Sequence, residues 1–235
     1  ADHHGDIVHG DNAMGDFYDD GATQVLETLA PQFGGADEIR TGAGPDVVIG
    51  GFGPDVIHTD ANDDTILGDS GYAKFTSSGD LEELSSDLTL IGQGVAATNV
   101  GDNDTIVTGS GDDVALGGYG SDYINVTNDS NRTAIADTGN DILVGDNATV
   151  IFNATLIEGS NARQDRITTI ATLHGNNDYI YSSLGKDILL GGQGIDTLDS
   201  GSGDAQDTDI LGDIILGDMG QATFATNGNG RIDNL

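Results

Sequence analysis

The sequence has no cysteine and few aromatic or basic residues. Without cysteine, neither a disulfide bond nor a thiol nucleophile is available, so another device must hold the fold together. Only 7 Lys and Arg side chains stand against 40 Asp and Glu. Nucleic acids and anionic membrane surfaces bind through Lys and Arg, and we therefore expect neither as a partner. No apolar run is long enough to cross a bilayer, so we expect no membrane insertion.

The formal net charge is −33 at pH 7 on a chain of 24.0 kDa. Self-repulsion of this size opposes a compact state unless bound cations neutralise it. Carboxylates are ligands of hard divalent cations, and Ca²⁺ fits a carboxylate-rich chain best. The 37 glycines exclude ordinary long helices, because each interior Gly costs about 1 kcal/mol relative to Ala. The composition therefore favours a non-helical chain that depends on calcium.

Aspartates recur every nine residues in three separate blocks of the chain, and an apolar residue follows each of them two positions later. This regular offset argues against the disorder that an acidic composition alone would suggest. The three blocks place these aspartates at Asp37, Asp46, Asp55 and Asp64; at Asp104, Asp113 and Asp122; and at Asp178, Asp187 and Asp196.

A longer repeat contains the nonapeptides. Four segments that begin with Asp-Ile or Asp-Thr-Ile end in Phe17, Phe75, Phe152 and Phe224, and we expect these four side chains to lie in the core. We divide the chain into 1–17, the end of one module; 18–75, with nonapeptides 35–69; 76–152, with nonapeptides 101–146; 153–224, with nonapeptides 175–218; and 225–235, the start of a further module. Neither end looks like a capping repeat, so we expect self-association or neighbouring repeats end to end.

Each nonapeptide combines a Gly-rich turn with about three strand-forming residues such as Val-Val-Ile or Thr-Ile-Leu. Two turns and two strands return the chain to its start after 18 residues, and such coils stack around a thin aliphatic core. Stacking would hold Asp46 above Asp64 in one row and Asp37 above Asp55 in the opposite row. Calcium between successive turns would bridge their carboxylates and turn carbonyls and remove the repulsion.

The strings GGFGPDVIH from Gly50, GGYGSDYIN from Gly117 and GGQGIDTLD from Gly191 resemble the nonapeptides of RTX (repeats-in-toxin) proteins. This resemblance implies an all-β fold, a parallel β-roll or β-solenoid in blocks joined by strand-rich linkers. It also implies type I secretion and an extracellular or cell-surface location. Calcium ligation by the sixth repeat position is carried over to the ten nonapeptide aspartates above, and further to Asp6, Asp141 and Asp213, which begin the Phe-ending segments.

A second acid follows a glycine in each Phe-ending segment, at Asp11, Asp69, Asp146 and Asp218. These residues fit a metal ligand and a turn cap equally well. Carboxylates are so frequent that no acid–base pair stands out, and the chain has neither a GxSxG nor an HExxH motif. We therefore expect no enzymatic activity.

Three roles remain open. The first is a structural repeat of a secreted or cell-surface bacterial protein, such as an adhesin, a surface layer or an extracellular fibre. The second is the secretion and folding region of an RTX enzyme or toxin. The third is an ice-binding solenoid, which would need a regular outward row of Thr, whereas Thr105 and Thr197 alternate with Val56.

Overall fold

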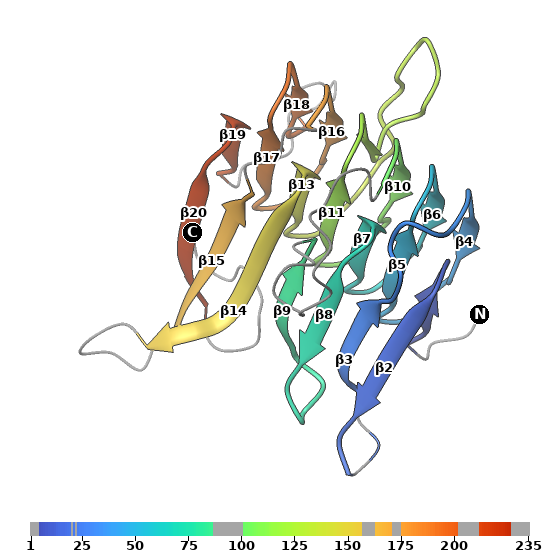
Figure 1. The fold of residues 1–235 in the computed structure, drawn as a ribbon. Coiled ribbons are helices and arrows are strands. Elements are labelled where there is room, and N and C mark those ends of the chain that lie inside the picture. Colours follow the sequence, from blue (N-terminus) through green and yellow to red (C-terminus); the bar gives the residue numbers. More distant parts are fainter. Residues whose placement is uncertain are drawn as a thin grey trace.

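The computed structural model describes residues 5–19, 21, 23–86, 101–156, 163–170, 175–201 and 212–226 (Figure 1). All regular structure in these residues is β-strand, arranged in three sheets. The expectation of an all-β fold with parallel sheets is thus confirmed. The described part of the chain contains no helix long and apolar enough to span a bilayer.

The central sheet is parallel and has seven strands. In spatial order it consists of β1 (Ile7–His9), β5 (Val47–Gly51), β7 (Thr65–Asp69), β11 (Val114–Gly118), β13 (Ile142–Asp146), β17 (Ile188–Gly192) and β19 (Ile214–Asp218). Its strands are almost entirely apolar up to the closing glycine, which is typical of parallel strands covered on both faces.

A second parallel sheet, the outer sheet, covers one face of the central sheet. It consists of β4 (Glu38–Arg40), β6 (Val56–His58), β10 (Thr105–Val107), β12 (Tyr123–Ile124), β16 (Tyr179–Tyr181) and β18 (Thr197–Asp199). Two turns and two short strands, one in each sheet, make one coil of a β-roll.

The third sheet is antiparallel and lies on the other face of the central sheet. It consists of β2 (Ala13–Phe17), β3 (Thr23–Thr28), β8 (Tyr72–Phe75), β9 (Leu81–Ser85), β14 (Ala148–Leu156), β15 (Arg163–Thr169) and β20 (Gln221–Thr226). The chain leaves the roll after every second strand of the central sheet, adds two antiparallel strands here and then returns (Figure 1).

The three nonapeptide blocks form one continuous roll. Val47 pairs with Thr65 inside the first block, and Thr65 pairs with Val114 across the boundary to the second. Ile142 pairs in the same way with Ile188 at the start of the third block. The strand-rich linkers therefore lie beside the roll, and the coils that they separate in sequence stack directly. The module boundaries at the four phenylalanines stay a prediction.

Alternate side chains of the central sheet enter two different cores. Val48 and Ile66 point toward the outer sheet, where they pack with Ile57 and Ile106. The next residues along the strands, such as Leu67, face the antiparallel sheet. Because side chains of a strand alternate between its faces, one apolar run of three residues serves both cores.

Two of the four phenylalanines lie in the core as expected: Phe75 is 7% exposed and Phe152 is 1% exposed, both beneath the antiparallel sheet. The same expectation is wrong for Phe17, which is 60% exposed. Phe17 lies on β2, which pairs only with β3 among the described strands, so no second neighbour covers it. The side chain of Phe224 lies outside the described part of the chain.

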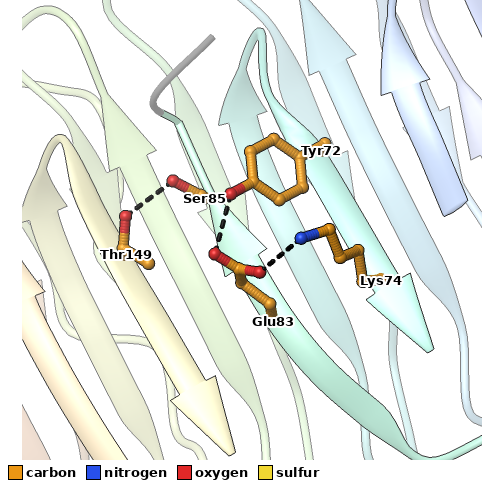
Figure 2. Close-up of polar contacts among 5 residues, drawn as sticks. All are labelled: Tyr72, Lys74, Glu83, Ser85 and Thr149. Atoms are coloured by element: carbon orange, nitrogen blue, oxygen red, sulfur yellow. Dashed lines mark hydrogen bonds and ion pairs between the residues drawn. The ribbon is translucent and has the colours of Figure 1, made fainter. Parts of the chain in front are cut away.

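The outward face of the antiparallel sheet carries a polar network that joins successive strand pairs (Figure 2). The hydroxyl of Tyr72 donates to Glu83 over 2.8 Å, and the ammonium of Lys74 donates to the same carboxylate over 2.7 Å. The hydroxyls of Ser85 and Thr149 are 2.7 Å apart. These contacts connect β8, β9 and β14, so the third sheet ties neighbouring modules together as the roll does.

Candidate metal centres along the edges of the roll

The thirteen predicted ligand aspartates form two rows, one on each edge of the roll. Each aspartate immediately precedes a strand, so the turn fixes its place. The outer row consists of the aspartates that precede the strands of the outer sheet, namely Asp37, Asp55, Asp104, Asp122, Asp178 and Asp196. The central row consists of the aspartates that precede the strands of the central sheet, namely Asp6, Asp46, Asp64, Asp113, Asp141, Asp187 and Asp213.

Hydrogen bonds connect every neighbouring pair in both rows. The backbone N–H of Asp46 donates to Oδ1 of Asp64 over 2.8 Å, and that of Asp37 donates to Asp55 over 2.8 Å, so the predicted stacking of these pairs is confirmed. The same bond continues from Asp55 to Asp104, 49 residues on, across the linker. All eleven bonds of the two rows measure 2.7–3.1 Å.

The second carboxylate oxygen, Oδ2, has no such donor in most of these residues. Nine of the thirteen have a buried Oδ2 without a hydrogen-bond partner among the described residues. They are Asp46, Asp55, Asp64, Asp104, Asp113, Asp122, Asp178, Asp187 and Asp196. A buried carboxylate oxygen needs a proton, a donor or a cation, because desolvation of an unpaired charge is costly. Two rows of such oxygens are what a calcium-binding repeat requires.

Burial raises the pKa of eight of these carboxyls. It raises the pKa of Asp113 to about 8 and those of Asp55 and Asp64 to about 7. Burial and the negative charge of Asp122 together raise the pKa of Asp178 to about 10. Without a cation, part of each row therefore holds protons at neutral pH, and a bound cation would compete with those protons.

We expect the calcium-free chain to gain β structure on acidification. A carboxyl whose pKa is raised by folding stabilises the fold fully below its unfolded pKa, about 3.9, and this contribution is lost as pH rises through the folded pKa. For Asp55, Asp64 and Asp113 that loss falls around the values of 7 to 8 given above. Far-ultraviolet circular dichroism of dialysed, calcium-free chain should therefore show more strand at about pH 5 than at about pH 8. Equal spectra at both pH values would contradict this.

Glycine carbonyls supply further oxygens beside the outer row. A Cβ on Gly117 would fall within 3.0 Å of both the carbonyl oxygen of Gly145 and Oδ2 of Asp122. Gly50 has the same relation to the carbonyl of Gly68 and to Asp55. The first glycine of the repeat thus leaves room for a cradle lined by carboxylate and carbonyl oxygens. All-oxygen sets of this kind suit Ca²⁺.

The tightest carboxylate group includes one residue that the sequence argument did not select. Carboxylate oxygens of Asp113, Asp137 and Asp141 lie within 4.8 Å of one another, and all three residues are buried. Asp137 Oδ2 accepts a hydrogen bond of 2.9 Å from the side-chain amide of Asn125, while its Oδ1 is buried with no hydrogen-bond partner in the part of the chain that the structure describes. Asp137 stands at the second position of its repeat, four residues before Asp141. An acidic residue at that position, where the nonapeptide motif has glycine, is the feature of the sequence that could have identified Asp137 as a ligand.

The second acids of the Gly-Asp pairs cap turns of the next coil. Asp11 accepts the N–H of Phe52 over 2.6 Å, and Asp69 accepts the N–H of Tyr119. Asp146 accepts the corresponding N–H from the third residue of the GGQGIDTLD repeat. The turn-cap role is therefore present in three of the four, whereas Asp218 is exposed.

The turns that precede the aspartates of both rows contain residues in left-handed backbone conformations. Gly53, the third glycine of its repeat, has φ of +118°, and Asn62 occupies the same repeat position with φ of +82°. Asn is the residue after Gly that best tolerates this region, so the degraded repeat keeps its turn.

The family model of the RTX calcium-binding nonapeptide repeat matches the chain in four copies, over residues 40–72, 99–132 and 174–205. These segments contain nine of the ten nonapeptide aspartates in the described rows, all but Asp37, together with the turns that position them. No curated protein and no solved structure matches the chain.

Proposed function

Because the chain carries RTX calcium-binding nonapeptide repeats, we propose that it is a calcium-dependent structural repeat of a secreted or cell-surface bacterial protein. The observation that carries the proposal is the set of nine buried Oδ2 atoms in two continuous rows. Calcium at the millimolar concentrations outside the cell would satisfy these oxygens, and calcium-poor cytosol would leave the chain unfolded for type I export. The proposal assigns no reaction to the chain.

Assembly end to end is the second part of the proposal. Among the described strands, β1 pairs only with β5 and β19 only with β17, so the central sheet has an open edge at each end. The outer sheet is open in the same way at β4 and β18. Open edges accept further strands, and a parallel coil of a second copy carries the matching aspartate rows. An adhesin, a surface layer or a fibre would use such growth.

The alternative roles have less support. A secretion and folding region of an RTX enzyme or toxin would share every calcium contact and differ only in lacking growth at the ends. Ice binding would use the exposed face of the outer sheet, where the register places Val56, Thr105, Tyr123, Tyr179 and Thr197 side by side in this order. That row is no regular array of threonines.

Calcium binding and growth can be tested together. We expect equilibrium dialysis to give several calcium ions per chain, and light scattering with electron microscopy to give rods whose length rises with protein concentration. Magnesium at equal concentration is the control, since Mg²⁺ retains its waters and suits octahedral sites. Calcium binding by a chain that stays monomeric would remove the assembly role and favour the secretion and folding region. A chain that binds no calcium would overturn the proposal altogether.

A further inference from the structure

We propose that Asp113, Asp137 and Asp141 bind one calcium ion with three carboxylates, and that this ion holds together an interruption of the roll. It binds more tightly than the ions between pairs of aspartates elsewhere in the two rows. The inference rests on the proposed function and deepens it, because it gives one site a third ligand and a role of its own. The family match ends at residue 132 and continues only from residue 174, so it assigns nothing to Asp137 or Asp141.

The coil that contains this site is longer than a regular coil. Asp113 and Asp141 are 28 residues apart in the sequence, whereas the stacked aspartates of a regular coil are 18 apart. The additional residues include a small antiparallel hairpin between β12 and β13, in which Val126 pairs with Ala134. It projects from the roll as the yellow-green loop of Figure 1. Asp137 lies just after the hairpin, where the chain returns to the roll.

The three carboxylates lie together at the edge of the central sheet. Asp113 precedes β11 and Asp141 precedes the neighbouring strand β13, and the backbone N–H of Asp113 donates to Oδ1 of Asp141 over 2.8 Å. Asp137 adds the third carboxylate, and one oxygen of each residue lies within 4.8 Å of the other two. Ca²⁺ binds oxygen at about 2.3–2.6 Å, so two ligands of one ion lie up to about 5 Å apart. The three oxygens therefore fit around a single ion.

Two of these carboxylates each offer a buried oxygen that no donor satisfies. Asp113 is 0% exposed and Asp137 is 1% exposed. Oδ2 of Asp113 and Oδ1 of Asp137 have no hydrogen-bond partner among the described residues. Burial and the negative charge of Asp137 raise the pKa of the third residue, Asp141, to about 11. A divalent cation would remove the cost of burying three acids together, because it supplies the charge that they lack.

Asn125 holds Asp137 in place from the side of the outer sheet. It lies directly after β12 and is fully buried, and its side-chain amide donates to Oδ2 of Asp137 and to Oγ1 of Thr108, over 2.9 Å in each case. Its own Oδ1 accepts the backbone N–H of Thr108 over 3.0 Å. One oxygen of Asp137 is thus fixed by a donor, and the other is left for the ion. A ligand that is already ordered loses less conformational freedom on binding, which favours affinity.

The third carboxylate gives this site both its affinity and its role. Calcium affinity in all-oxygen sites depends on the charge of the ligand set and on the rigidity of the site, and Asp137 with its Asn125 contact raises both. The ion would also join Asp137 on the returning chain to Asp113 on the preceding coil, which closes the loop that contains the hairpin. β13 then stacks on β11 with Val114 beside Ile142, despite the longer connection.

Asp137→Asn tests the third ligand. The variant loses one negative charge, but its amide oxygen can still accept the hydrogen bond from Asn125. In calorimetric titrations of the full chain with calcium, we expect the first ion to bind most tightly in the wild type and about tenfold or more weakly in the variant. The backbone N–H groups of Thr127 and Ile135, which close the hairpin, should exchange faster in the variant at the same calcium concentration.

Asp60→Asn is the matched control. Asp60 occupies the same position of its own nonapeptide, four residues before Asp64, but its side chain is exposed and lies outside the group of three carboxylates. Asn tolerates the positive φ of +76° at this position. The change of charge is the same in both variants. Equal calcium affinity and equal hydrogen exchange in Asp137→Asn and Asp60→Asn would overturn this inference alone.

Asp137→Gly restores the residue that the repeat motif has at this position and leaves two carboxylates. We expect this variant to lose the tight site as Asp137→Asn does, while the remaining ions bind as in the wild type. A tight site retained in Asp137→Gly would assign the affinity to Asp113 and Asp141 and contradict the role of the third ligand. A wild-type chain that binds no calcium would overturn the proposed function and this inference with it.

Discussion

In excess EGTA at neutral pH, the chain is expected to lose most of its strand signal in circular dichroism and to regain it when calcium is added. Nine buried oxygens of the two aspartate rows lack a hydrogen-bond donor among the described residues. Each such group costs about 1–3 kcal/mol when it is left unsatisfied. A domain has a total stability of about 5–15 kcal/mol, so nine of these costs are enough to unfold it.

Salt distinguishes this cause from simple charge repulsion. At about 1 M NaCl the Debye length falls to about 3 Å, which screens the repulsion that a net charge of −33 creates on the surface. Sodium chloride does not supply ligand geometry to buried oxygens, so we expect it to restore little structure in EGTA. Full refolding by salt alone would assign the calcium requirement to net charge, and a chain that is folded in EGTA would refute it.

The stacking of the aspartates could be predicted because the repeat period is strict. A spacing of nine residues sets two half-turns per coil, so Asp46 must lie beside Asp64 and Asp37 beside Asp55. The bond from Asp55 to Asp104 could not be predicted in this way. The linker between them has no repeat, and only the pairing of β6 with β10 and of β7 with β11 shows that the roll is continuous across it.

The exposed Phe17 and the missed Asp137 have different causes, and both depend on contacts between residues far apart in the sequence. The Phe-ending segments share one pattern, but Phe17 differs from Phe152 because β2 has one neighbouring strand and β14 has two. Sheet neighbours are long-range contacts that a local motif does not encode. Asp137 was missed because the family motif places glycine, not an acid, at its repeat position, and only the fold shows that it reaches Asp113.

Gly117→Ala is expected to weaken the fold strongly although it adds a single methyl group. Gly117 lies in the middle of the roll, and a Cβ there would fall within 3.0 Å of the carbonyl oxygen of Gly145 and of Oδ2 of Asp122. The carboxylate of Asp122 cannot move away without loss of a hydrogen bond of the roll, because its Oδ1 accepts the backbone N–H of Asp104. Overpacking of this kind costs about 1–3 kcal/mol, occasionally more.

The added methyl also fills the space between a carboxylate and a carbonyl oxygen, which is where a calcium ion would bind. We therefore expect Gly117→Ala to need a higher calcium concentration for folding, in addition to its lower resistance to urea in saturating calcium. Gly35→Ala is the matched control, because a Cβ at exposed Gly35 would meet no atom within 4 Å. Its free energy of unfolding should stay within about 0.5 kcal/mol of the wild-type value, as for most surface substitutions. If Gly117→Ala folded at the same calcium concentration as Gly35→Ala, the first glycine of the repeat would have no role in the cation cradle.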